Sequence, residues 1–319
     1  MKAPIYNGEP ILTVEALAEV LAFSQEGLLR VAKSADKYYQ ANPPQKKPSG
    51  GIRQTYSVKP PLKTIQTQIL HLIFHKVCYP DYLQGSIKDK ERPRDYIANA
   101  CLHSGSKVLI HEDIRNFFPS ISPRLVWKMW HGLFGFSADV AHILTELTTF
   151  EGGVPQGACT SSYIGNLVLW DCEPQLVQEL RDRELVYTRY VDDISISADR
   201  YLEQYEQKSV TSRVYHMLLA KGLQPNRRKR KMQTSSRRME VHNLNVNSGR
   251  PTLSKGDRMR IRAAVRQCET MSETQRETEE YRSLFLSVSG RVAQFSRLHP
   301  KQAERLSRRL KVVKPPDSI

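Results

Sequence analysis

The stretch LVYTRYVDDISIS at residues 185–197 places two adjacent carboxylates, Asp192 and Asp193, between two runs of apolar and β-branched residues. Such runs predict two short strands with the acids at the turn between them. Adjacent aspartates at the tip of a hairpin repel each other unless a cation lies on them, and a divalent, oxygen-binding metal ion is the natural cation. An ordinary acidic β-turn is the alternative interpretation.

A third carboxylate, Asp113, follows a strand candidate at residues 107–111. A strand end can expose an acid beside the tip of a neighbouring hairpin, and three such carboxylates can hold two Mg²⁺ ions. One ion would lower the pKa of an attacking hydroxyl, and the other would hold a triphosphate and stabilise the leaving pyrophosphate. Phosphoryl transfer needs mainly this positioning and charge neutralisation.

The positive charge of the chain is concentrated in its last third. Residues 227–319 contain 23 Lys and Arg against 9 Asp and Glu, a net charge of +14, whereas residues 1–226 contain 25 against 24 and carry only +1. This distribution predicts that the C-terminal third binds a polyanion such as nucleic acid. A solvated basic face that aids solubility is the alternative.

Cysteine usage and hydropathy indicate a reduced, cytoplasmic protein with no membrane partner. The chain has no apolar run long enough to cross a membrane and no signal-peptide pattern at its first residues. Its five cysteines are far apart and form no CxxC pair, so the sequence predicts neither a zinc site nor a disulfide framework. They are Cys78, Cys101, Cys159, Cys172 and Cys268.

The order of the expected elements indicates an α+β domain with an antiparallel sheet. Two short helices are expected within 13–33, and a mobile loop or hairpin is expected at 42–53. One face of a further helix is marked by Ile65, Ile69, Leu72, Ile73 and Val77. The segments 122–147, 161–183 and 202–221 are expected to be mainly helical. Two β-like pieces at 239–246 and 250–253 precede a helical C-terminus that is interrupted near Pro300.

Four segments resemble, in order and spacing, the motifs of reverse transcriptases. DIRNFFPS at 113–120 resembles motif A, GVPQGACTSS at 153–162 motif B, YVDD at 190–193 motif C and GLQPNRRK at 222–229 motif D. The resemblance covers residues 45–245. It implies a right-hand polymerase, an α+β fold with fingers, palm and thumb around an antiparallel palm sheet.

Four parts of the chain follow from this resemblance. It implies an N-terminal helical extension at 1–40, fingers at 41–105, a palm with an inserted fingers segment at 106–245 and a basic thumb at 246–319. The palm of this family carries its metal ligands and the thumb holds nucleic acid.

The resemblance also assigns the catalytic groups. Asp113, Asp192 and Asp193 match the ligands of two Mg²⁺ ions in the active site. Lys229 matches the motif D lysine that protonates pyrophosphate, although its basic neighbours leave this register open. These residues would make the chain an RNA-directed DNA polymerase, a nucleotidyltransferase.

Residues of motifs A and B match the family's deoxynucleotide site. Phe118, five residues after Asp113, matches the steric gate that excludes a 2′-hydroxyl. A core aromatic is the alternative, which Phe117 fits better. Ile114 is expected beside the dNTP. Gln156 and Gly157 would line the nascent base pair, with glycine allowing close backbone approach.

Basic residues of the loop at 42–53 match the cations that clamp the triphosphate in the fingers. They are Lys46 or Lys47, together with Arg53. Solvated loop charges are the alternative interpretation.

The pentapeptide NACLH at 99–103 resembles the NAxxH signature of bacterial retron reverse transcriptases, and it implies that Asn99 and His103, together with Tyr190, contact nucleic acid. A helix-end Asn and a surface His are the alternative. Retrons also usually carry Val-Thr-Gly after motif D. Here the matching place reads Val-His-Asn at 241–243, so only the valine is kept.

A retron enzyme implies a particular reaction and set of partners. It binds a cognate noncoding RNA, primes from the 2′-hydroxyl of an internal guanosine and makes a short branched DNA joined to RNA, called msDNA. The family further implies antiphage defence with a separate effector protein. Arg305, Arg308 and Arg309 of the basic thumb would meet RNA phosphates.

Two other classes remain open from the sequence. One is another small bacterial reverse transcriptase, of the abortive-infection or intron-derived kind, which primes differently. The other is a scaffold that chiefly holds nucleic acid and an effector. Three intact aspartates argue against a purely structural protein, because such a protein need not keep these costly acids.

Overall fold

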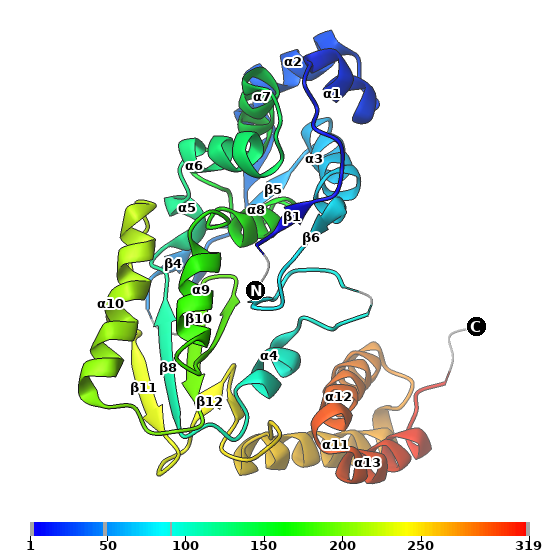
Figure 1. Ribbon diagram of the computed structural model, residues 1–319. Helices are drawn as coiled ribbons and strands as arrows, with labels where there is room; N and C mark the ends of the chain where they lie inside the picture. The colour runs from blue at the N-terminus through cyan, green and yellow to red at the C-terminus, as the bar shows by residue number, and fades with distance from the viewer. Residues whose placement is uncertain (1–2, 47–49, 90, 317–319) are drawn as a thin grey trace. The chain divides into compact units, whose positions relative to one another are not determined.

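The computed structural model describes residues 3–46, 50–89 and 91–316, and the chain divides into two compact units (Figure 1). Residues up to 99 together with 107–234 form the first unit. Residues 100–106 together with those from 235 onward form the second. Each unit has its own apolar core.

The first unit begins with the two expected short helices, α1 (Val14–Val20) and α2 (Gln25–Lys33). Each starts at a hydroxyl residue that caps it: Thr13 Oγ1 accepts a hydrogen bond from the amide of Ala16, and Ser24 Oγ accepts one from Gly27. The next helix, α3 (Leu62–Leu72), is shorter than expected. Val77 lies in strand β6 (Val77–Cys78), so its assignment to the helix was wrong.

A five-stranded sheet in the order β11-β8-β10-β9-β7 carries the site. Its strands are β7 (Leu83–Gln84), β8 (Val108–Asp113), β9 (Val186–Tyr190), β10 (Asp193–Ala198) and β11 (Lys231–Thr234). The four strands from β8 to β11 pair antiparallel, as the sequence predicts. The edge strand β7 instead pairs parallel to β9, so the sheet is mixed.

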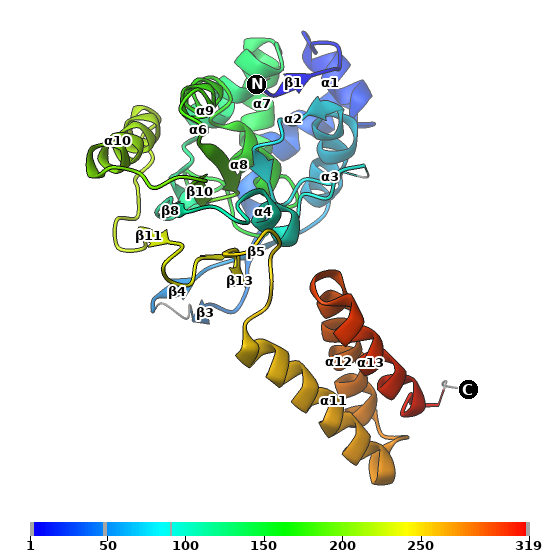
Figure 2. The same ribbon diagram turned by 60° about the horizontal axis from the view of Figure 1, so that its bottom comes forward.

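Further helices and short strands complete the first unit. Helices α9 and α10 lie on one face of the sheet (Figures 1 and 2). Three two-stranded pairings, β1–β6, β2–β5 and β3–β4, lie outside the main sheet, and β3–β4 is the hairpin expected within 42–53. The remaining strands are β1 (Ile5–Tyr6), β2 (Tyr39–Ala41), β3 (Gln45–Lys46), β4 (Ile52–Arg53) and β5 (Tyr56–Val58). The remaining helices are α5 (Phe117–Ser120), α6 (Pro123–Lys128), α7 (Ala138–Thr148), α8 (Ser161–Leu167), α9 (Glu173–Arg181) and α10 (Gln204–Ala220), while α4 (Tyr96–Leu102) spans the boundary of the units.

The second unit contains a small hairpin and a bundle of three helices (Figure 2). These helices are α11 (Lys255–Gln275), α12 (Glu279–Leu298) and α13 (Pro300–Val312). On α13 and just after it, the side chains expected to face the core are buried: Ala303, Leu306, Leu310 and Val313. The basic residues of α13 therefore lie on its outer faces, as the 3.6-residue period requires.

The hairpin of strands β12 (Glu240–Val241) and β13 (Leu244–Asn245) gives the departure from Val-Thr-Gly a structural meaning. His242 and Asn243 form its two-residue turn, with φ of +50° and +63°. Two positive φ angles are the mark of a type I′ turn, in which asparagine replaces glycine at small cost. Asn243 thus supplies the backbone conformation that a glycine would.

None of the helices in the described part of the chain is both long enough and apolar enough to cross a membrane.

Candidate active site

The sheet brings the three predicted carboxylates together at one end. Asp193 pairs with Asp113 across β10 and β8, and with Tyr190 across the hairpin. Val191 and Asp192 form the two-residue turn. Val191 has φ of +61°, which is unusual for a β-branched residue and places backbone strain directly beside the acids.

Main-chain hydrogen bonds hold three segments around this turn. The amide of Ile114 donates to the carbonyl of Asp192 at 3.1 Å, which links the end of β8 to the turn. The amide of Asn226 donates to the carbonyl of Asp113 at 2.7 Å. The segment at 222–229 is therefore fixed to the same strand end as the carboxylates.

The side chain of Asp113 is buried and held by two donors. Asn226 Nδ2 donates to its Oδ1 at 2.7 Å, and Lys229 Nζ donates to its Oδ2 at 2.8 Å. The hydrogen bond with Asp113 raises the pKa of Lys229, so its ammonium stays charged. Among its basic neighbours, Lys229 is thus the residue whose ammonium reaches the carboxylates.

The other two aspartates are crowded by each other and by Asp113. Desolvation raises the pKa of Asp192, and the charge of Asp113 adds to this effect. Desolvation raises the pKa of Asp193 to about 7, and the negative charges of Asp192 and Asp113 add to this effect. Asp193 nevertheless keeps part of its surface open to solvent. A cation at this point would relieve the repulsion.

The donor set fits a hard divalent cation in its chemistry, because carboxylate oxygens are the ligands that Mg²⁺ prefers. In the arrangement seen here, no group of three or more His, Cys, Asp or Glu side chains within residues 3–46, 50–89 and 91–316 is close enough to act as a ready metal cage. Lys229 and Asn226 take up the oxygens of Asp113 instead. Each oxygen of Asp113 has a second lone pair, so a metal ion bound there would lie beside the Lys229 ammonium.

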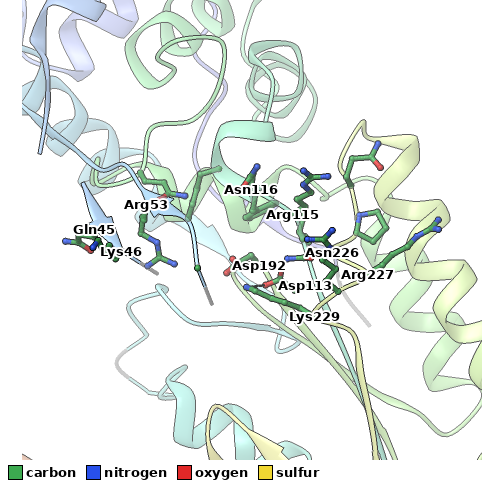
Figure 3. A pocket seen from close by; sticks show the side chains of 18 residues that line it. Gln45, Lys46, Arg53, Asp113, Arg115, Asn116, Asp192, Asn226, Arg227 and Lys229 are labelled. Carbon is green, nitrogen blue, oxygen red and sulfur yellow. Dashed lines mark hydrogen bonds and ion pairs between the residues drawn. The ribbon is translucent and has the colours of Figure 1, made fainter. Parts of the chain in front are cut away.

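Asp113 and Asp192 line a cavity of about 1060 Å³ (Figure 3). Lys46 and Arg53 stand on the β3–β4 hairpin at one side, while Asp113, Asp192 and Lys229 lie together near the centre. Lys47 lies outside the described residues. The cavity lining also contains the predicted nucleotide-site residues Ile114, Phe118 and Gln156.

The two phenylalanines after Asp113 differ in burial. Phe117 is buried in the core, whereas Phe118 is half-buried, and both reach the cavity wall. Their rings rest on Gly165 of α8, where an added Cβ would lie 3.0 Å from Phe117 Cε1 and 3.2 Å from Phe118 Cε1. Phe118 is thus the better placed of the two to meet a nucleotide.

Gly157 allows a close approach of the backbone of strand β5, at Tyr56. It has φ of +115°, and a Cβ there would lie 2.5 Å from the carbonyl oxygen of Tyr56. The amide of Tyr56 also donates to the carbonyl of Gln156 at 2.8 Å. Gly157 therefore has a structural role here, its place beside the base pair stays a prediction, and only Gln156 of this pair lies among the described lining residues.

The NAxxH residues are buried. Asn99 and His103 are 0% and 1% exposed, so the alternative of a surface histidine does not agree with the structure, and their contact with nucleic acid stays a prediction. The carbonyl of His103 accepts a hydrogen bond from Ser106 Oγ at 2.8 Å. Tyr190 is half-buried, with its ring packed against Gly85.

The three arginines of α13 that were predicted to bind RNA are not equivalent. Arg309 makes two hydrogen bonds with Glu269, at 2.6 and 2.7 Å, and Arg308 pairs with Glu304 on its own helix. Arg305 is exposed and makes no ion pair with any described acidic residue. Arg305 is therefore the most available of the three for a phosphate.

Two networks behind the site were not predicted. Arg189 and Glu173 form a fully buried ion pair beneath the turn. Glu112 is buried next to Asp113, and accepts a hydrogen bond from Tyr215 at 3.1 Å and pairs with Arg230 at 3.3 Å. The sequence did carry a signal for Arg189 and for Glu112: each is a charged residue at an inward-facing position of an otherwise apolar strand, which indicates a buried partner.

Comparisons with known proteins agree with these motifs. The reverse transcriptase (RNA-dependent DNA polymerase) family matches residues 45–282. The retron Se72 reverse transcriptase of Salmonella heidelberg is 37% identical over 99% of this chain and 83% of its own length. The retron Ec48 reverse transcriptase of Escherichia coli is 32% identical over 97% and 78%.

Among solved structures, telomerase from Candida albicans aligns with 65% of this chain and 40% of its own chain, at 10% identity and a TM-score of 0.41, which is too low to carry an argument. The sequence matches show to which family the chain belongs. The chain belongs to the reverse transcriptase family, as a retron reverse transcriptase, and is an RNA-directed DNA polymerase.

Proposed function

We propose that this enzyme copies a cognate noncoding RNA into a short branched msDNA, primed from an RNA 2′-hydroxyl, within an antiphage defence system. The observation that carries the proposal is the cluster of Asp113, Asp192 and Asp193 at one strand end, in a chain similar to retron reverse transcriptases along nearly its whole length. The RNA, its DNA product, dNTPs and a separate effector protein are the proposed partners. The cytoplasm is the proposed location.

Asp113, Asp192 and Asp193 are the proposed ligands of two Mg²⁺ ions. Bound there, such ions activate the attacking hydroxyl and stabilise the leaving pyrophosphate. Lys229, whose Nζ lies 2.8 Å from Asp113 Oδ2, is the proposed proton donor to the leaving pyrophosphate. This contact supports the assignment, because it places a proton donor beside one of the proposed metal ligands.

The cavity wall provides the dNTP contacts. Lys46 and Arg53 of the β3–β4 hairpin are positioned to bind the triphosphate, and Lys47 belongs to the same proposed set. Phe118 faces the sugar and excludes a 2′-hydroxyl by its bulk, while Ile114 and Gln156 complete the wall. These contacts select and orient the nucleotide, which is most of what phosphoryl transfer requires.

The right-hand organisation is proposed with the boundaries expected from the sequence: an extension at 1–40, fingers at 41–105, palm at 106–245 and thumb at 246–319. The five-stranded sheet is the proposed palm, and the bundle α11–α13 is the proposed thumb.

Sequencing the nucleic acid that copurifies with the protein tests the proposal. We expect a single RNA species joined to DNA through a 2′,5′ linkage, which a debranching enzyme would separate into two strands. The Asp192→Asn variant should copurify with the RNA alone. Unbranched DNA, or DNA with a free 5′ end, would exclude retron priming and favour another small bacterial reverse transcriptase.

Binding of that RNA should weaken steeply with salt, because phosphate contacts release counterions. The slope of the logarithm of the RNA-binding constant against the logarithm of the salt concentration is negative. Replacing Arg305 with Gln should make it less steep by about 0.7 to 0.9, because one phosphate contact is lost. Arg309→Gln is the matched control, and should change the slope less because Glu269 already pairs with Arg309. Equal slopes for wild type and Arg305→Gln would place the RNA on another surface.

A further inference from the structure

Arg189 lies wholly inside the first unit, and each of its five N–H groups has an acceptor. Nε and Nη2 donate to the two carboxylate oxygens of Glu173 at 2.6 and 2.7 Å. Nη1 donates to the carbonyls of Gly165 at 3.0 Å and Val191 at 2.9 Å, and Nη2 donates to that of Asn166 at 3.0 Å. A guanidinium holds its donors in a rigid plane, so this side chain fixes three segments relative to one another.

The first of these segments is the turn itself. Val191 is the strained residue that directly precedes Asp192, and its carbonyl is one of the acceptors of Arg189. Strained backbone persists only where its surroundings determine it. Arg189 is part of those surroundings, since it lies on β9 two residues before Val191.

The second segment is the end of helix α8, whose last carbonyls lack partners within the helix. Gly165 presents its carbonyl to Arg189 and its Cα to the rings of Phe117 and Phe118. The residue that seats Phe118 is therefore also the residue that Arg189 holds. A rotation of α8 would move both contacts together.

The neighbouring residue on α8 extends the same connection to Tyr190. Asn166 accepts from Arg189 through its carbonyl and donates from Nδ2 to the carbonyl of Gly85 at 3.2 Å. A Cβ on Gly85 would lie 2.8 Å from the ring of Tyr190, so Gly85 is where that ring rests. The rings of Phe118 and Tyr190 thus rest on glycines whose backbone Arg189 holds, at Gly165 directly and at Gly85 through Asn166.

Stability alone does not account for such a group. A buried ion pair gains little over well-packed apolar residues of similar volume, because desolvation offsets the attraction. The guanidinium instead fixes the relative positions of α8 and the turn, because it donates three hydrogen bonds to their backbone carbonyls. Glu173 compensates its charge, and Tyr187 donates to Glu173 at 2.7 Å.

We propose that Arg189 is a positioning residue that holds the Asp192 turn in register with Gly165 and Gly85, on which the rings of Phe118 and Tyr190 rest. Arg189 thereby sets both the discrimination between deoxyribonucleotides and ribonucleotides and the rate of DNA synthesis. The proposal rests on the proposed role of Phe118 as the steric gate. The turn carries Asp192, and α8 carries Gly165, on which the ring of Phe118 rests, so a loss of register between them moves the sugar relative to the reacting groups.

The test measures kcat and KM for a dNTP and the matching rNTP on a primed RNA template. Arg189→Lys keeps the charge but has three donors in place of five. The double variant Arg189→Met/Glu173→Gln removes both charges and leaves neither partner buried as an unpaired ion. In both we expect folded protein, a lower kcat for the dNTP and a preference for dNTP over rNTP that falls by about tenfold or more, as expected for small misplacements at a reacting centre.

Two further variants separate the possible failures. Arg213→Lys alters an ion pair with Glu179 that is exposed, and should leave the preference for dNTP unchanged. Phe118→Ala should itself relax the preference; if it does not, the gate assignment fails while Arg189 can still be judged by kcat. A normal preference in the folded Arg189 variants beside a relaxed Phe118→Ala would overturn the proposal. Loss of the folded state in both Arg189 variants would also overturn it, because Arg189 would then be a residue of the fold alone.

Discussion

Replacing Asp192 with Asn is expected to lower the rate of DNA synthesis by at least about 10³-fold, because it removes several kcal/mol of transition-state stabilisation by a metal ion. Asp192 lines the cavity, and its carbonyl accepts the amide of Ile114, which the substitution leaves intact. The loss should therefore come from chemistry and not from folding. Single-turnover extension of a primed RNA template at saturating dNTP measures it.

Asp199→Asn is the matched control, since Asp199 is an exposed acid just beyond the other end of β10. It should extend primers at the wild-type rate, and both variants should bind the RNA as the wild type does. Synthesis by Asp192→Asn within tenfold of wild type would make the metal-ligand assignment wrong. If that variant lost synthesis but still restrained the effector, the protein would act chiefly as a scaffold in defence.

Arg189→Ala is expected to reduce the free energy of unfolding by about 3–5 kcal/mol, because it leaves the Glu173 carboxylate buried without its partner. Glu173 is 1% exposed in its side chain, so water cannot replace the guanidinium without opening the core. Three backbone carbonyls also lose their donor. Urea unfolding followed by tryptophan fluorescence reports on the first unit alone, since Trp127, Trp130 and Trp170 all lie there.

The comparison variant is Arg213→Ala, which breaks the exposed pair with Glu179 between α10 and α9. An exposed pair contributes about 0–1 kcal/mol, so this variant should unfold close to the wild-type midpoint. If the two substitutions lowered the free energy of unfolding by similar amounts, water would have to reach Glu173, and the Arg189–Glu173 pair would not be shielded from solvent.

Local signals in the sequence were enough to predict the catalytic end of the sheet. Apolar residues on both sides of Asp192 and Asp193 specify two strands and a turn, and Asp113 ends a strand of the same kind. Their adjacency follows because an antiparallel pair places a strand end beside a hairpin tip. The register of Asp193 opposite Asp113 confirms this.

Features that depend on distant partners were not predictable in the same way. Arg189 and Glu173 lie on different elements, and Lys229 meets Asp113 across 116 positions of sequence. Pattern and propensity describe one element at a time, so they give no partner for a charged side chain. The burial of Asn99 and His103 has the same origin, because polar residues at a helix end usually face water.

The contact between Gly157 and Tyr56 limits which part of the chain around the β3–β4 hairpin can move. Tyr56 is fastened to the loop that carries Gln156 by a backbone hydrogen bond and by an approach too close for any side chain at residue 157. A swing of the β3–β4 hairpin therefore hinges on the chain before Tyr56, and it carries Lys46 and Arg53 without displacing Gln156. If Lys46 and Arg53 bind the triphosphate and Gln156 meets the base, as proposed, such a movement would release the triphosphate while the surface that meets the base stays still.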